Sequence, residues 1–189
     1  MVLGVVGSLG LTGCSSLVSL NPFVTDKEAM MDPALTGIWN CSETNGVYVI
    51  RRDGAAYAIT YFEKSDVVKL KARMLQVGEA RLVDVVSEDE GVLQLRVHGI
   101  ARVWPEASRL RIALLDADWL TKEPSAQQLP MQLAGDSTVL TAPGDAIRGF
   151  LLKHGLDDKA YGKTVVLDRV QFCDGEFLDS VANMLSGKR

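Results

Sequence analysis

The sequence predicts a mainly β protein with C-terminal helices, an α+β chain in which an antiparallel meander closes into a barrel or half-barrel. Apolar and polar residues alternate with a period of two over much of the chain after Pro33. Tight-turn sequences separate these stretches about every ten residues, and the apolar period becomes helical only near the end. A meander of this length must close or fold over, because its edge strands would otherwise stay exposed.

Composition fits one globular domain. The chain has 189 residues, of which 47% are hydrophobic and 23% charged, and its formal net charge is −4. Because there is no basic excess, we expect no nucleic-acid partner. No run reaches the roughly 20 apolar residues that a membrane-spanning helix needs, so the sequence excludes that class as well.

The N-terminus has the features of an export signal. Residues 2–11 form a short apolar stretch, which we interpret as the hydrophobic part of a signal peptide over residues 1–13. It ends at Leu11-Thr12-Gly13-Cys14, and these four residues resemble the lipobox of bacterial lipoproteins. The resemblance implies cleavage before Cys14, a diacylglycerol on its sulfur, and a fatty acid such as palmitate on the new amino group. The alternative is a buried free cysteine.

Two details refine this prediction. No Lys or Arg precedes Cys14, although export signals normally begin with basic residues, and we interpret this as a start codon placed too far downstream. Ser15 follows Cys14, whereas in the enterobacterial lipoproteins an Asp there favours retention in the inner membrane. The resemblance therefore implies lipid anchoring to the outer membrane, on the periplasmic side, with the membrane as a partner.

Residues 14–33 are predicted to form a lipid-anchored tether, followed by a single barrel-like domain over residues 34–189. The segment contains turn-forming Asn21-Pro22 and a charged patch at residues 26–28. The alternative is a short helix over residues 25–31, because Thr25 and Glu28 have the spacing of a capping box.

The body is predicted as strands first and helices afterwards. Helices are expected over residues 143–153, ending before Gly155, and over residues 177–185, each with one apolar stripe. These helices would cover a side or an end of the sheet. Strands are expected over residues 55–62, 67–74, 93–98, 109–114 and 164–170.

The first strand carries a second resemblance. Gly37-Ile38-Trp39 resembles the G-x-W motif of lipocalins and related small barrels. In that family the Trp packs across the barrel base beneath an Arg from near the last strand, and the resemblance implies this role for Arg169. The wider layout also resembles an uncharacterised family of bacterial lipoproteins, which implies no activity. The alternative for Trp39 is an ordinary large core residue.

The sequence offers little for catalysis. No His, Cys or Glu spacing typical of a metal site occurs, and neither a nucleophile elbow nor a phosphate-binding glycine loop is present, so no catalytic residue, metal or cofactor is predicted. Asp116 and Asp118 could form a carboxylate pair, although such residues more often cap a helix. Asp84 could pair with Arg81 or Arg102 inside the sheet.

The cysteines suggest an oxidising compartment. Without Cys14, an even number remains, Cys41 near the end of the first strand and Cys173 after the last. We predict a disulfide between them, because those strands become neighbours when a barrel closes. Two separately buried thiols are the alternative.

Three functions remain open. The leading hypothesis is a non-catalytic, lipid-anchored envelope protein that binds a small apolar ligand or an envelope partner. A structural subunit of a larger envelope complex would instead expose an apolar patch and have no internal cavity. An enzyme would need a polar cleft. For the first hypothesis, the residues expected to line a cavity or form the barrel floor are Trp39, Tyr48, Tyr57, Tyr61 and Arg169.

Overall fold

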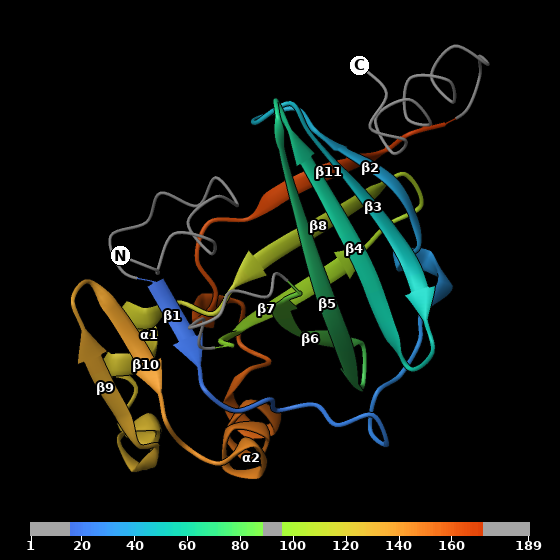
Figure 1. Cartoon of the computed structure of the whole chain (residues 1–189). Coiled ribbons are helices and arrows are strands. Elements are labelled where there is room, and N and C mark those ends of the chain that lie inside the picture. The colour runs from blue at the N-terminus through green and yellow to red at the C-terminus, as the bar shows by residue number, and fades with distance from the viewer. Residues whose placement is uncertain (1–15, 89–95, 172–189) are drawn as a thin grey trace.

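The computed structural model describes residues 16–88 and 96–171, and within them eight antiparallel strands close into a barrel (Figure 1). The strand order is β6-β5-β4-β3-β2-β11-β8-β7, and pairing of β6 with β7 closes the ring. The predicted mainly β fold is therefore confirmed as a lipocalin-like barrel. The barrel strands are β2 (Gly37–Cys41), β3 (Gly46–Asp53), β4 (Ala56–Glu63), β5 (Asp66–Val77), β6 (Ala80–Ser87), β7 (His98–Pro105), β8 (Arg109–Leu114) and β11 (Val165–Arg169).

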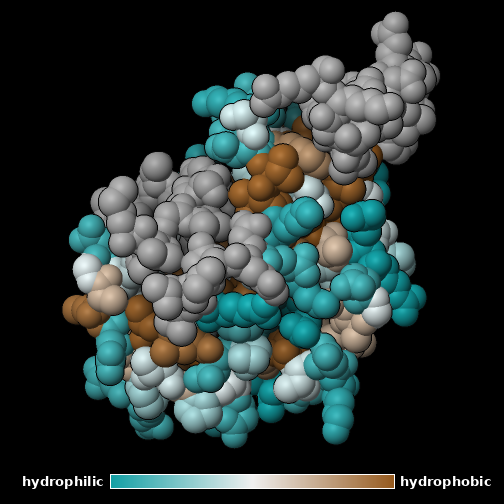
Figure 2. Space-filling view, in the orientation of Figure 1, coloured by the Kyte–Doolittle hydropathy of each residue, from teal (hydrophilic) through white to brown (hydrophobic). Residues whose placement is uncertain are grey.

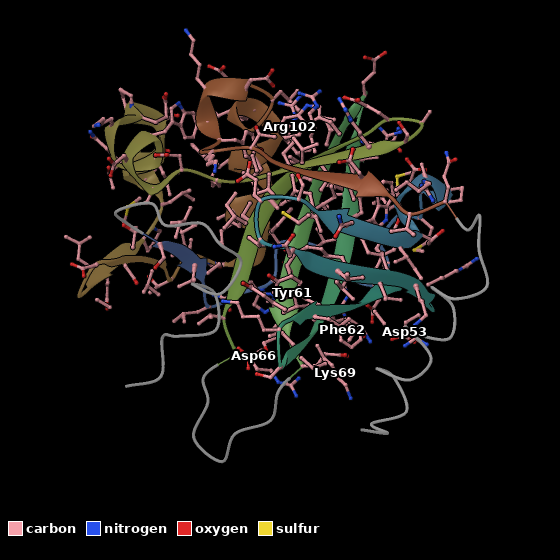
Figure 3. All side chains as sticks on the ribbon, turned by 90° about the horizontal axis from the view of Figure 1, so that it is seen from above. Asp53, Tyr61, Phe62, Asp66, Lys69 and Arg102 are labelled. Carbon is pink, nitrogen blue, oxygen red and sulfur yellow. The ribbon has the colours of Figure 1, made fainter. Side chains whose placement is uncertain are left out.

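The alternation of side chains decides which face of each strand is buried. Figure 3 shows Tyr61 of β4 inside the ring of strands, whereas Asp66 and Lys69 of β5 lie on its outer side. Four of the predicted strands coincide with β4, β5, β8 and β11 to within three residues at each end. The predicted strand at 93–98 differs: residues 93–95 lie outside the described residues, 96 and 97 are not in a strand, and β7 begins at His98.

Three short strands extend the sheet beyond the barrel. β1 (Ser16–Ser19) contacts the start of β7, runs parallel to β10 (Ser137–Leu140), and β10 pairs with β9 (Met131–Ala134). The helices lie on the same side of the molecule as these strands (Figure 1). They are α1 (Ala117–Lys122) and α2 (Gly144–His154), with 3-10 turns at η3 (Pro124–Gln128) and η4 (Asp158–Ala160). A further 3-10 turn, η2 (Pro33–Leu35), lies on the other side of the barrel, just before β2 (Figure 1).

Two hydrophobic cores result from this arrangement. One fills the barrel, and the other lies between the outer wall of the barrel and the helices. Leu82 and Ile100 contribute to the outer core from β6 and β7, and Ile147 and Leu151 contribute from α2. The predicted helix at 143–153 is α2, displaced by one residue, and it ends at Gly155 as expected. The helix predicted at 177–185 lies outside the described residues.

The predicted tether over residues 14–33 is wrong for the part that the structure describes. Residues 16–19 form β1, and Phe23 and Val24 are fully buried in the outer core. Apolar residues on a tether would face water, whereas here they cover the barrel wall. The alternative helix at 25–31 is reduced to a single turn. The Glu28 carboxylate accepts from the Thr25 backbone N–H at 3.2 Å, which is one of the two capping-box bonds, and from the Thr25 hydroxyl at 2.7 Å.

Candidate functional site

The floor of the barrel is built from Trp39 and Arg169. These residues are register partners on β2 and β11, and the Arg169 guanidinium carbon lies 4.1 Å from the centroid of the Trp39 ring. Arg169 also donates to the carbonyl oxygens of Ala34 at 2.6 Å and Thr36 at 3.0 Å, while the Trp39 indole N–H donates to the Leu35 carbonyl at 3.0 Å. The contact that the lipocalin resemblance implied is present. It ties η2 across one end of the barrel.

Gly37 explains why this motif begins with glycine. Its φ is +143°, a backbone region that L side chains rarely adopt. A Cβ atom at this position would lie 2.7 Å from Nη1 of Arg169. The approach of the guanidinium to the backbone therefore requires a residue without a side chain.

The three tyrosines expected to line a cavity pack into the interior of the barrel. Tyr48, Tyr57 and Tyr61 are at most 8% exposed and belong to one buried cluster with Trp39. The rings of Tyr48 and Tyr61 have centroids 4.4 Å apart, and the Tyr61 hydroxyl donates to the Glu63 carboxylate. The Tyr57 hydroxyl accepts from the Asp32 backbone N–H at 2.7 Å. At these positions the barrel is filled by its own side chains.

Burial controls the ionisation of these tyrosines. Desolvation raises the pKa of Tyr48 far above its usual value, and the neighbouring Tyr61 raises it further. Desolvation likewise raises the pKa of Tyr57 and of Tyr61. These phenols are neutral at physiological pH, which suits packing inside an apolar core and provides no base for catalysis.

An open groove lies on the outside of the barrel. It has a volume of about 530 Å³ and lies between α1, η3 and the β9–β10 hairpin. We call it the β9 groove. Its lining is mostly apolar and consists of Leu120, Thr121, Gln127, Leu129, Pro130, Met131, Gln132, Leu133 and Thr138.

None of the β9 groove residues was singled out from the sequence. The signal that could have located them is the Gly135-Asp136 pair between two four-residue stretches, which is typical of a tight hairpin. Leu120 of α1 and Gln127 of η3 lie beside the hairpin because of how the chain folds between positions 120 and 138, which contain the whole lining.

The polar residues considered for chemistry have structural roles. Asp84 pairs with neither Arg81 nor Arg102: its carboxylate contacts the ring nitrogen Nδ1 of His98 and accepts from the Phe23 backbone N–H at 2.7 Å. Its side chain is completely buried, because β6 turns it toward the outer core. Asp116 caps α1 by accepting from the Trp119 N–H at 2.7 Å, which is the helix-capping role that the sequence offered as the alternative to a carboxylate pair.

Arg102 lies on the outer wall of the barrel, where its side chain is 12% exposed. Its Nη1 donates to the Leu156 carbonyl at 2.8 Å and pairs with the Asp158 carboxylate at the same distance, while its Nε has no hydrogen-bond partner. The guanidinium also lies over the rings of Trp104 and Tyr161, 4.9 Å and 5.8 Å from their centroids. These contacts attach the segment after α2 to the barrel wall.

The predicted cysteine sites are only partly described. Cys41 is fully buried and carries a free thiol in the structure. Cys14 and Cys173 lie outside the described residues, so lipid attachment and the Cys41–Cys173 disulfide stay predictions. Among the described residues no cluster of His, Cys, Asp and Glu could hold a metal ion, and no helix is long and apolar enough to cross a membrane.

No protein-family model matches this sequence, and neither the curated proteins nor the solved structures include a match. The class that the fold defines is a closed, eight-stranded antiparallel barrel with helices against one side.

Proposed function

We propose that this protein is a lipid-anchored, non-catalytic component of the bacterial cell envelope, on the periplasmic side of the outer membrane, that binds a small apolar ligand. The observation that carries the binding activity is the β9 groove. Its volume of about 530 Å³ and its mostly apolar lining are typical of sites that hold small apolar molecules. The anchor rests on the lipobox at Leu11-Thr12-Gly13-Cys14.

The packing inside the barrel supports placing the ligand outside it. The aromatic side chains that would have lined an internal cavity are buried against one another. A ligand inside the barrel would have to displace the packed rings of Tyr48 and Tyr61, whereas the β9 groove is open at the surface.

Cys14→Ser tests the anchor. Removing the sulfur that accepts the lipid should abolish metabolic acyl labelling and release the protein from the membrane fraction, or leave it uncleaved. Cys41→Ser is the matched control, because it removes a buried thiol from the same chain and should leave acyl labelling unchanged. Unchanged labelling and fractionation of the Cys14 variant would refute the lipid anchor.

Native mass spectrometry of the full chain, released from membranes in mild detergent, tests the ligand. We expect a bound apolar small molecule, with lower occupancy in Leu133→Asp, because a carboxylate at the groove raises the cost of burying an apolar molecule there. Leu152→Asp on α2 is the control, since it changes an exposed leucine outside the groove. Wild-type protein without any bound small molecule would contradict the binding activity.

A structural subunit of an envelope complex is the second candidate. Leu133 is 80% exposed, and β9 is the last strand of the sheet, a combination that suits strand addition by another protein. This function predicts a protein partner that co-purifies with the wild type and is lost with Leu133→Asp, in place of a small molecule.

A further inference from the structure

The chain between the predicted lipid and the first strand is very short. Cys14 stands two residues before Ser16, where β1 begins, and two residues reach at most about 7 Å. β1 is fixed to the body: the hydroxyls of Ser16 and Ser137 are 2.6 Å apart, and Leu17 and Val18 are buried. A lipid on Cys14 would therefore hold the start of β1 at the membrane surface.

The register of the extending strands places the β9–β10 turn at the same end. Ser16 is the partner of Ser137, and Ser137 is the partner of Ala134. Two strand spacings of about 5 Å separate Ser16 from Ala134, and Leu133 is the next residue along β9. Figure 1 shows the start of β1 beside this turn, with α2 beyond the opposite end of β10. Leu133 thus lies within about 20 Å of the predicted lipid-bearing sulfur.

The outer edge of β9 carries no charged residue. Exposed edges are commonly protected by lysine or other charged residues, by proline or by a very short strand; β9 is four residues long and follows Pro130, so charge is the protection that it lacks. The four residues of β9, Met131–Ala134, carry no charge, and the Leu133 side chain is 80% exposed. On the other side of β9 no further strand is described. Figure 2 shows hydrophobic residues gathered over this part of the molecule.

We propose that the β9 edge lies against the bilayer that holds the anchor, with Leu133 among the acyl chains, and that the ligand of the β9 groove is an acyl chain of a membrane lipid. The proposal rests on the proposed lipid anchor. It explains why an uncharged edge strand with an exposed leucine stands next to the attachment point: the bilayer removes this surface from water.

Photo-cross-linking of the full chain in bacterial cells tests the proposal. A diazirine-bearing amino acid replaces Leu133 in one variant and Leu152 on α2 in the control. Both leucines are exposed, so both replacements should leave the fold intact. After irradiation, we expect phospholipid adducts at position 133, several-fold more abundant than at position 152, when the cross-linked peptides are weighed by mass spectrometry.

The mass of the N-terminal peptide from the same samples reports acylation of Cys14 separately. Suppose that Cys14 is acylated but position 133 shows no excess of lipid adducts, or is cross-linked to a protein. Either result overturns the membrane-contact proposal and leaves the anchor intact. A protein adduct would in addition favour the structural-subunit function. Unmodified Cys14 refutes the anchor itself. Lipid adducts at 133 together with acylated Cys14 support both.

Discussion

At the scale of single residues, the barrel floor depends on contacts among Arg169, Trp39 and Gly37. Arg169 donates hydrogen bonds to two carbonyl oxygens of the segment before β2. The same guanidinium makes a cation–π contact with the Trp39 ring. It can do so only because Gly37 presents no side chain in its path. The floor is therefore sensitive to a single added methyl group.

Gly37→Ala should lower the free energy of unfolding by about 1 to 3 kcal/mol, because it adds backbone strain at φ +143° and a clash with Arg169. The control is Gly54→Ala in the β3–β4 turn, where φ is +61° and a Cβ would meet nothing within 4 Å. The control substitution should lower the free energy of unfolding by about 1 kcal/mol, through backbone strain alone. Urea unfolding measures both variants, and equal losses would show that the Arg169 contact imposes no constraint.

The tyrosines give a second prediction at this scale. All four, including Tyr161, have a pKa raised by burial, so the folded protein holds their protons more tightly than the unfolded chain does. The resulting stabilisation is fully present below about pH 10, the unfolded pKa, and is lost as the pH rises above it. Tyrosinate absorbance should show no phenol titrating near pH 10 in the folded state and all four doing so in denaturant. A phenol with an ordinary pKa in the folded protein would contradict this.

At the scale of elements, the attachment of the N-terminal segment to the barrel depends on Asp84. Its buried carboxylate joins β6 to His98 of β7 and to the Phe23 backbone N–H. Asp84→Ala should lower the free energy of unfolding by about 2 to 4 kcal/mol, since it leaves buried donors without acceptors. The control is Asp168→Ala on β11, whose partner Arg109 is solvent-exposed, and this should cost at most about 1 kcal/mol. Thermal unfolding that ranks the two variants equally would contradict the role of Asp84.

Local pattern explains which elements the sequence predicted. β4, β5 and β8 are hairpin strands, so their register is set by tight turns and by alternation that a short stretch of sequence contains. β1 could not be found in this way: its four residues pair in parallel with β10, more than a hundred residues later. A segment just after a lipobox therefore looked like a tether, although Leu17 and Val18 are buried.

At the scale of the whole molecule, the closed ring could be predicted but the state of its interior could not. Closure of the barrel could be predicted because any long meander leaves edge strands with unpaired backbone groups, and closing the sheet pairs them. Whether a barrel of about eight strands is filled or hollow depends on how side chains from strands distant in sequence pack, as Trp39 of β2 does against Arg169 of β11. The β9 groove was not predicted for a different reason: α1, η3 and the β9–β10 hairpin, which form it, were not recognised in the sequence.

The short connection between lipid and barrel makes a final prediction about the whole molecule. Inserting about ten Gly and Ser residues after Ser15 should lift the body away from the membrane by a flexible linker of about 17 Å root-mean-square length. Acylation of Cys14 and thermal stability should stay unchanged, because β1 and its contacts begin only at Ser16. Lipid cross-links from position 133 should fall several-fold, since the anchor no longer holds the β9 edge at the bilayer. If the cross-links persist, Leu133 and the β9 groove bind lipid by their own affinity. The length of the connection between Cys14 and β1 then does not set how the protein is oriented on the membrane.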